Sequence, residues 1–249
     1  MWCGIISIFP DMFSGFLNHG IVHQAQKKGL LQCQLWNPRD FSGNKHNIVD
    51  ERPYGGGPGM VMKAEPLRQA IRAAKNEALE PSKVVYLSPE GQQLNTNLIR
   101  QLALEPSIIF VSGRYEGIDQ RVIHQDIDEM ISIGDYVLSG GELAVMVVID
   151  TITRFIPGVL GDEASNKEDA FTEENNGLLD CPHYTRPPEW SGEAVPEVLL
   201  SGDHQAIERW RRKQKIGKTW QLRPDLLQSV ELSQEDLKLL QEYKIELGF

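Results

Sequence analysis

Short apolar segments that alternate with amphipathic ones fill the first two thirds of this chain of 249 residues. This order is typical of a parallel sheet whose strands are joined by crossover helices, since strands covered on both faces have nearly continuous apolar sequences. The sequence therefore predicts an α/β fold. The expected strands are Gly4–Phe9, Cys33–Trp36, Val84–Leu87, Ile108–Val111 and Glu129–Ile133.

Two helices are predicted between and after these strands. The segment Pro66–Ala78 has apolar residues at positions i, i+3, i+4 and i+7, which share one face of a helix. The segment Glu142–Phe155 is more apolar, so we expect it to be a buried helix. The residues on the shared face of the first helix are Leu67, Ala70, Ile71 and Ala74.

The composition changes at residue 161, where acidic residues begin to dominate and large apolar residues nearly vanish. Turn residues at Asn175–Gly177 add to this pattern, which predicts a flexible linker. Beyond it we expect a helix over Asp203–Lys215 that ends at Gly217, and another that begins after Ser233 as its N-cap. The predicted organisation is an α/β domain at 1–160, the linker at 161–177 and a small helical C-terminal domain at 178–249.

The net charge of −10 argues against a protein that coats nucleic acid through its overall field. Only the segment Arg209–Arg223 clearly reverses this balance, so a local basic surface is expected there. Trp210 and Trp220 lie in it, and a mixture of aromatic and basic residues fits either an RNA-binding surface or an amphipathic helix with buried tryptophan. The basic residues are Arg209, Arg211, Arg212, Lys213, Lys215, Lys218 and Arg223.

The N-terminal segment has no basic leader, and no stretch of the chain is apolar enough to span a bilayer, so a cytoplasmic location is expected. The three cysteines, Cys3, Cys33 and Cys181, form no C-x-x-C pair and are interpreted as reduced thiols. His19 and His23 have helical i, i+4 spacing, but Gly20 and the lack of a third ligand nearby argue against a metal. No metal site is predicted.

Three of the expected strands run directly into loops rich in glycine, serine or proline. In parallel sheets, loops at the carboxyl ends of strands bind the ligand, so the ligand site is expected there. Glycines suit a ligand held by backbone groups, although such glycines also occur in simple turns. The loops are Leu87–Gly91, Val111–Gly117 and Ile133–Gly141.

The segment Pro53–Met60 contains four glycines and two prolines, which exclude a helix or a strand interior. A functional loop is favoured over a bare turn. One alternative is a nucleotide-phosphate enzyme that uses this loop, but the Gly-Lys-Ser/Thr ending of a phosphate-binding loop is missing, since Met60 follows Gly59.

Longer motifs resemble a known family. They are Arg52–Met60, Val111–Asp119, Ser132–Leu143, Arg154–Leu160, Leu178–Pro187 and Val198–Gly202, and together they cover nearly the whole chain. In this order they closely resemble the bacterial tRNA (guanine-N1)-methyltransferases, TrmD, of the SPOUT class. The resemblance implies a parallel sheet threaded as a deep trefoil knot and a homodimer whose active sites are shared between two chains, whereas the apolar pattern alone suggests an ordinary doubly wound sheet.

The family's reaction is methylation of N1 of guanosine 37 in tRNA, at a guanosine preceded by another guanosine. The methyl donor is S-adenosyl-L-methionine, and the resemblance also implies a need for Mg²⁺, whose site the residues do not locate. By the same resemblance the donor contacts are Tyr86, Leu87, Ser88, Pro89, Gly113, Glu116, Ile133, Gly134, Tyr136, Leu138, Gly140 and Gly141.

The resemblance also gives roles to Asp169, as the general base, and to Arg154, as the cation that stabilises O6 of the guanine. Taken alone, Arg154 fits a cation at a helix C-terminus, and Asp169 fits one solvated charge among several. A non-catalytic RNA-binding protein is therefore a second alternative. The chain departs from the family pattern at Ala144, where proline is usual, and in a longer segment at Phe171–Gly177.

Overall fold

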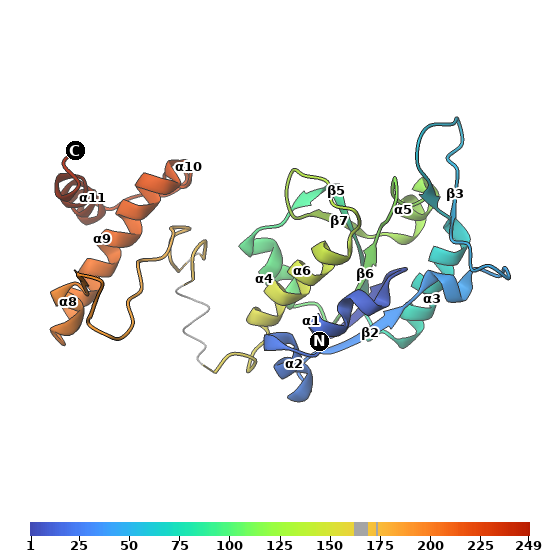
Figure 1. Cartoon of the computed structure of the whole chain (residues 1–249), viewed down its shortest axis with the longest axis horizontal. Coiled ribbons are helices and arrows are strands. Elements are labelled where there is room, and N and C mark those ends of the chain that lie inside the picture. The colour runs from blue at the N-terminus through green and yellow to red at the C-terminus, as the bar shows by residue number, and fades with distance from the viewer. Residues whose placement is uncertain (162–168, 173) are drawn as a thin grey trace. The chain divides into compact units, whose positions relative to one another are not determined.

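The computed structural model of the chain describes residues 1–161, 169–172 and 174–249, in two compact units, Met1–Gly161 and Asp162–Phe249 (Figure 1). Part of the predicted flexible linker, residues 162–168 and 173, lies outside the described residues. The helices and strands of the first unit are β1 (Trp2–Ile6), η1 (Pro10–Phe13), α1 (Ser14–Leu17), α2 (Gly20–Lys27), β2 (Gln32–Trp36), η2 (Pro38–Phe41), β3 (Asp50–Glu51), β4 (Val61–Met62), α3 (Ala64–Glu77), β5 (Ser82–Gln93), α4 (Thr96–Ala103), β6 (Ser107–Ser112), α5 (Gln120–Asp126), β7 (Glu129–Ser132) and α6 (Glu142–Phe155). Those of the second unit are β8 (Glu189–Trp190), β9 (Glu193–Ala194), α8 (Glu197–Leu200), α9 (His204–Leu222), α10 (Pro224–Leu227) and α11 (Gln234–Glu246).

The first unit is built on a five-stranded sheet in the order β2-β1-β6-β5-β7, and every pair of neighbours is parallel. This confirms the predicted α/β fold with a parallel central sheet. Because successive side chains of a strand point to opposite faces, β6 divides its residues between two cores. Ile108 and Phe110 lie in one, and Ile109 and Val111 lie in the other.

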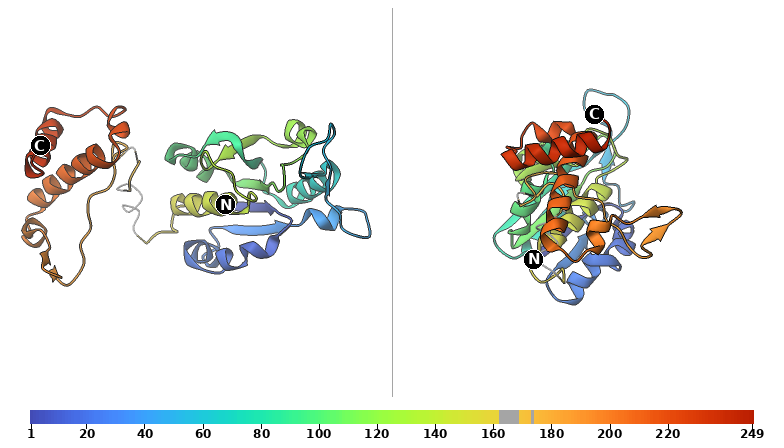
Figure 2. Two further views of the ribbon diagram at one scale, coloured as in Figure 1. Left: turned by 45° about the horizontal axis from the view of Figure 1, so that its top comes forward. Right: turned by 90° about the vertical axis from the view of Figure 1, so that its left-hand side faces the viewer.

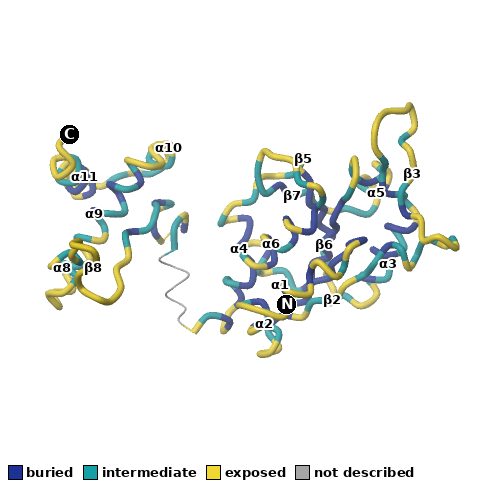
Figure 3. Tube along the Cα trace, in the orientation of Figure 1, coloured by how far each residue is buried: buried dark blue, intermediate teal, exposed yellow. Residues whose placement is uncertain are grey.

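Helices cover both faces of this sheet. The core around Phe110 includes residues of α1, α2, α4 and α6, and the core around Ile109 includes residues of α3 and α5 (Figure 1). Figure 3 shows the central strands as buried. A parallel sheet covered in this way explains why its strands have continuous apolar sequences.

The first strand differs from the prediction, because β1 begins at Trp2 and ends at Ile6 instead of spanning Gly4–Phe9. The Ser7 hydroxyl accepts a hydrogen bond from the Phe9 amide at 2.9 Å, which turns the chain into η1. The strand predicted at Val84–Leu87 corresponds to β5, which is longer than predicted because its pairing with β7 resumes after a bulge. The strands predicted near β2, β6 and β7 are confirmed within one residue at each end.

Both helices predicted for the first unit are confirmed. The helix α6 has the predicted bounds, and α3 is shifted towards the N-terminus by one or two residues at its ends. No prediction was made for the short helices α1, α2, α4 and α5, which have four to eight residues each.

In the second unit α9 begins after Asp203, as predicted, but continues through Gly217 to Leu222. Gly217 does not end the helix. A Cβ atom at Gly217 would lie 2.2 Å from the ring of Tyr243, so the glycine allows α11 to pack closely against α9 (Figure 2). Ser233 is the N-cap of α11, as predicted, and forms a capping box with Asp236.

Among the described residues, no helix is long and apolar enough to cross a membrane.

Candidate active site

A cavity of about 360 Å³ lies beside the carboxyl ends of β5, β6 and β7. Its volume falls in the usual range for a small-molecule site. All twelve residues predicted to contact the methyl donor line it. The three glycine-containing loops that the sequence pointed out thus meet at one place.

The first of these loops is a bulge within β5. Leu87 and Gln92 both pair with Ile131 of β7, so the residues between them, including Ser88 and Pro89, leave the ladder and line the cavity. At the end of the bulge, a Cβ atom on Gly91 would lie 2.4 Å from the backbone nitrogen of Ile131. Only glycine allows the two backbones to approach so closely.

The second loop requires glycine at position 113 because of Tyr86. A Cβ atom at Gly113 would lie 2.7 Å from the Tyr86 hydroxyl. Tyr86 is buried, and this burial, followed by the negative charge of Glu90, raises the pKa of its phenol. Tyr86 therefore remains protonated at neutral pH, as a neutral wall of the cavity.

The third loop bends sharply at Gly134, whose φ of 150° lies outside the range that other residues favour. A Cβ atom there would lie 2.5 Å from the ring of Tyr136. The Tyr136 amide donates to the Gly134 carbonyl at 3.0 Å, and the Tyr136 hydroxyl donates to the Ile133 carbonyl at 3.4 Å.

The charges that line the cavity are Glu90, Glu116 and Arg114. The Arg114 charge is already neutralised by an ion pair with Glu142, whose side chain is fully buried. The two remaining carboxylates favour a ligand with positive charge and disfavour a phosphate. Sequence reasoning did not identify Glu90, Arg114 or Glu142 as site residues, although all three lie in or next to the loops that it pointed out.

The loop Pro53–Met60 has no helix or strand, as its composition predicts, and four of its glycines have φ between 80° and 116°. Its residues from Tyr54 to Gly59 are exposed (Figure 3). The loop is joined to the cavity, because the Glu116 amide donates to the Met60 carbonyl at 3.0 Å and the Gly59 backbone lies against the Glu116 side chain. The strand β4 follows the loop, so the loop does not lead directly into a helix N-terminus, which argues against a phosphate-binding loop.

The structure places the two predicted catalytic residues in different units. Arg154 lies in the last turn of α6, half-buried, in the first unit. Asp169 lies in the second unit, where it is also half-buried.

The backbone of Asp169 is part of a hydrogen-bonded turn. Its carbonyl accepts from the Thr172 hydroxyl at 2.8 Å and from the Asn175 amide group at 3.4 Å. Thr172 and Asn175 are buried, and the Asn175 amide group also donates to the carbonyl of Leu178, a residue of the second unit's core. Asp169 is thereby tied to that core through Asn175.

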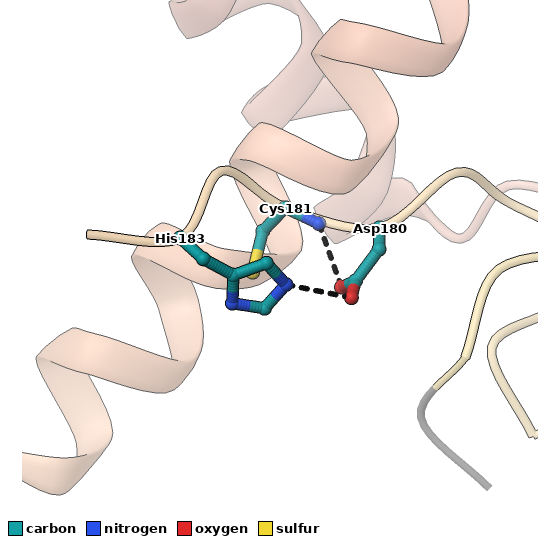
Figure 4. Close-up of side chains that lie close together, drawn as sticks. All are labelled: Asp180, Cys181 and His183. Carbon is teal, nitrogen blue, oxygen red and sulfur yellow. Dashed lines mark hydrogen bonds and ion pairs between the residues drawn. The ribbon is translucent and has the colours of Figure 1, made fainter. Parts of the chain in front are cut away.

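Asp180, Cys181 and His183 have ligand atoms within 4.8 Å of one another, the spacing of a metal site, among the described residues (Figure 4). Figure 4 shows the His183 Nε2 and the Cys181 amide directed at the Asp180 carboxylate, at 2.9 and 2.7 Å. Burial opposes ionisation of Asp180, but these two hydrogen bonds and the charge of Lys215 together lower its pKa.

We interpret this group as an anchor instead of a metal centre, because Lys215 Nζ lies 3.7 Å from Asp180 and would repel a cation. The Leu179 amide donates to the Thr219 hydroxyl at 2.9 Å. This hydrogen bond and the ion pair of Asp180 with Lys215 both hold the segment around Asp180 against α9. A thiol and an imidazole are also poor ligands for Mg²⁺, so the group does not fit the magnesium that the resemblance implied. His19 precedes α2 and does not share a helix with His23.

Most of the basic residues of the segment Arg209–Arg223 are paired within their own unit. Three of these ion pairs join α9 to α11, and no ion pair between described residues includes Arg211 or Lys218. Trp220 packs at the second unit's core, and the Trp210 ring lies against that of Tyr184 at an interplanar angle of 56°, so both tryptophans have partners within the unit. The ion pairs are Arg209–Glu242, Arg212–Asp236, Lys213–Glu246, Lys215–Asp180 and Arg223–Asp225.

Comparison with known proteins agrees with these observations. Residues 1–229 match the family model described as tRNA (Guanine-1)-methyltransferase TrmD. A tRNA (guanine-N(1)-)-methyltransferase of Tolumonas auensis is 56% identical over 248 residues, which covers 100% of this chain and 98% of the relative.

Two further relatives carry the same name. The protein of Escherichia coli O81 is 57% identical over 99% of this chain and 95% of its own length. The protein of Edwardsiella ictaluri is 56% identical over 99% of this chain and 96% of its own length. With its parallel sheet, with two of the family's motifs lining one cavity and with this identity over its full length, this chain belongs to the TrmD family of tRNA (guanine-N1)-methyltransferases.

Proposed function

We propose that this chain transfers the methyl group of S-adenosyl-L-methionine to N1 of guanosine 37 in tRNA, where another guanosine precedes it. The observation that carries this proposal is that one cavity is lined by all twelve residues at which the family motifs predict donor contacts. The full-length identity to proteins named for this reaction supports it. We also propose a cytoplasmic location, where tRNA is available.

The cavity suits this donor chemically. S-adenosyl-L-methionine carries a sulfonium and an ammonium group but no phosphate, and Glu90 and Glu116 supply negative charge on the cavity wall. The glycine loops expose backbone N–H and C=O groups, which can bind the polar edges of the ligand.

In the reaction, N1 of guanine is a poor nucleophile while it carries its proton. We assign Asp169 as the general base that takes this proton as the N1–methyl bond forms and the methyl–sulfur bond breaks. S-adenosylhomocysteine leaves with the electron pair of the broken bond. Negative charge then develops on O6 of the guanine, and we assign Arg154 to stabilise it.

The second unit supplies the tRNA contact in this proposal. Its ion pairs leave Arg211 and Lys218 as the residues of the basic segment best able to bind phosphates. Arg211 is exposed, which favours such a contact.

On family grounds we further propose a deep trefoil knot in residues 1–160 and a homodimer with shared active sites. An apolar face on α6 supports the dimer, since Leu143 and Val147 are 51% and 41% exposed. Exposed apolar residues on one helix face are typical of protein interfaces.

The substitution Asp169→Asn tests the assigned base. We expect methylation to fall by about three orders of magnitude or more, since an amide cannot accept the proton. Donor affinity, measured by calorimetry, should stay nearly unchanged. Full activity in this variant would remove Asp169 from the mechanism, and nucleotide hydrolysis without methyl transfer would favour the phosphate-loop alternative.

A mixture of two inactive variants tests the shared site. If Arg154 and Asp169 act from different chains, a dimer of one Arg154→Ala chain and one Asp169→Asn chain keeps one intact site. Random mixing of subunits should then restore about a quarter of the activity. No restoration in a mixture whose dimers demonstrably exchange would mean that each site uses a single chain.

A further inference from the structure

The two loops on either side of the cavity are joined by a buried ion pair that belongs to neither the proposed donor contacts nor the proposed catalytic pair. Arg114 Nε donates to Glu142 Oε2 at 2.8 Å. The side chain of Glu142 is fully buried, and that of Arg114 is only 15% exposed. Arg114 follows Gly113 in the second loop, and Glu142 follows Gly141 of the third loop at the start of α6.

Further contacts of Arg114 reach the third loop directly. Its Nη1 donates to the Ser139 carbonyl at 3.1 Å. Its side chain passes over Gly140, where a Cβ atom would lie 2.1 Å from Arg114 Nε. The Gly141 amide donates to the Gly113 carbonyl at 2.8 Å, so backbone and side chain hold the same two loops together.

The other oxygen of Glu142 is also satisfied. Oε1 accepts from the Ser7 hydroxyl at 2.8 Å, at the end of β1. The guanidinium group of Arg114 stacks on the ring of Phe9, 4.7 Å from its centroid. Both oxygens of Glu142 therefore accept hydrogen bonds, and the Arg114 guanidinium contacts Glu142, Ser139 and Phe9, so a buried pair with several partners holds this geometry.

We propose that Arg114 and Glu142 are positioning residues for the methyl donor. They hold the Gly113 loop and the Gly140–Gly141 loop at the separation that the donor requires. Arg114 lines the cavity, but its Nε and Nη1 donate hydrogen bonds to Glu142 and Ser139. Its role is therefore to hold the two loops in place. This inference rests on the proposed function, because it takes the cavity to be the donor site.

The substitution Glu142→Gln tests the proposal, because it keeps the size of the side chain and removes the charge. We expect the donor Kd, measured by calorimetry, to rise about 10–100-fold, as is found when an outer residue that orients a binding group is lost. The KM for the donor should rise with it, kcat at saturating donor should change little, and tRNA affinity should not change. A general loss of structure would not produce this division.

The variant Arg114→Lys keeps the charge but cannot donate to Glu142 and Ser139 with the same fixed geometry. It should raise the donor Kd by a smaller factor, about 5–10-fold. This variant decides the question if Glu142→Gln fails to fold. The matched control is Asp126→Asn, because Asp126 pairs with Arg68 at 2.9 Å in the same unit with a side chain 15% exposed, and neither residue lines the cavity.

Unchanged donor Kd and KM in a folded Glu142→Gln or Arg114→Lys variant would overturn the proposal, and so would an equal rise in the Asp126→Asn control. Failure of the unsubstituted protein to bind S-adenosyl-L-methionine would instead refute the proposed function. The two failures are therefore distinguishable.

Discussion

The two units of this protein are stabilised in different ways. In the first, a parallel sheet is covered on both faces by large apolar cores, and its cavity is shaped by close backbone approaches at glycines. In the second, the core is small, and three ion pairs join α9 to α11. The difference teaches that the first unit depends mainly on apolar burial and steric fit, with the single buried pair Arg114–Glu142 between its cavity loops, whereas the unit proposed to bind tRNA depends more on charge and should respond to pH and salt.

The strongest test of steric fit is Gly91→Ala. Its new Cβ atom would meet backbone atoms of Met130 and Ile131 at 2.4 Å, and these cannot move without separating β5 from β7. We expect the first unit to lose about 3 kcal/mol of stability, the upper end of the usual cost of overpacking. Hydrogen exchange followed by mass spectrometry would assign the loss to that unit.

The control is Gly15→Ala, since nothing lies within 4 Å of a Cβ atom at that glycine of α1. It should leave stability equal or slightly higher. Equal effects of both substitutions would mean that the contact at Gly91 does not restrict the sheet.

The strongest test of the charge network is Asp236→Asn. Asp236 accepts from Arg212 at 2.7 and 2.9 Å and from the Ser233 amide at 3.1 Å, as part of the capping box. We expect the second unit to lose about 2 kcal/mol, because a charge-assisted pair and part of a helix cap are removed together. Chemical denaturation would measure this loss, and the exposed Asp225→Asn should show no comparable change.

Acid should weaken the second unit through the same residue. The hydrogen bond from the Arg212 guanidinium lowers the pKa of Asp236 below its ordinary value of 3.8. Burial acts in the opposite direction, and hydrogen bonds from Ser233 lower the pKa further. A lowered pKa means that the carboxylate stabilises the folded state at pH values above the ordinary one, and that this contribution is lost as the pH falls through the folded pKa.

We therefore expect the denaturation midpoint of the second unit to fall as the pH drops below about 3.8. The Asp236→Asn variant should show a flatter dependence. Asp119 in the first unit has a lowered pKa too, but its partner Arg121 is 69% exposed, so its effect should be smaller. If the first unit lost stability more steeply than the second as the pH falls, the proposed difference between the two units would be wrong.

The smallest effect is expected for tRNA binding by Arg211→Ala and Lys218→Ala. Each should weaken binding a few-fold and reduce the slope of log Kd against log salt by about one, as the loss of one phosphate contact does. Arg209→Ala should change binding less, because this guanidinium already pairs with Glu242 at 2.6 Å. If the salt dependence of binding changed equally in all three variants, the ion pairs within the unit would not determine which basic side chains contact the tRNA.

Several elements could be predicted because their patterns are local. The apolar sequence of Ile108–Val111 and the helical period of Glu142–Phe155 need no knowledge of the rest of the chain, and Ser233 is recognisable as a cap from its own neighbours. The helix α4 was missed, since its eight residues give too short a period to detect.

Gly217 shows the limit of local reasoning. A glycine near the end of an amphipathic helix is usually read as a stop, and only the position of the Tyr243 ring explains why α9 continues through it. The pair of Arg114 and Glu142 is likewise invisible in the sequence, because the two residues are 28 positions apart and are joined only by the fold.

The amino-acid order by itself determined the approximate positions of the five sheet strands and of the longer helices, the glycine-containing loops and the family motifs, because these depend on near neighbours along the chain. Only the tertiary structure decided that three of the loops meet at one cavity, that Glu142 is buried against Arg114, and that most cations of α9 are paired. The physical reason is that burial and charge pairing depend on distances between segments remote in sequence, which no local pattern contains.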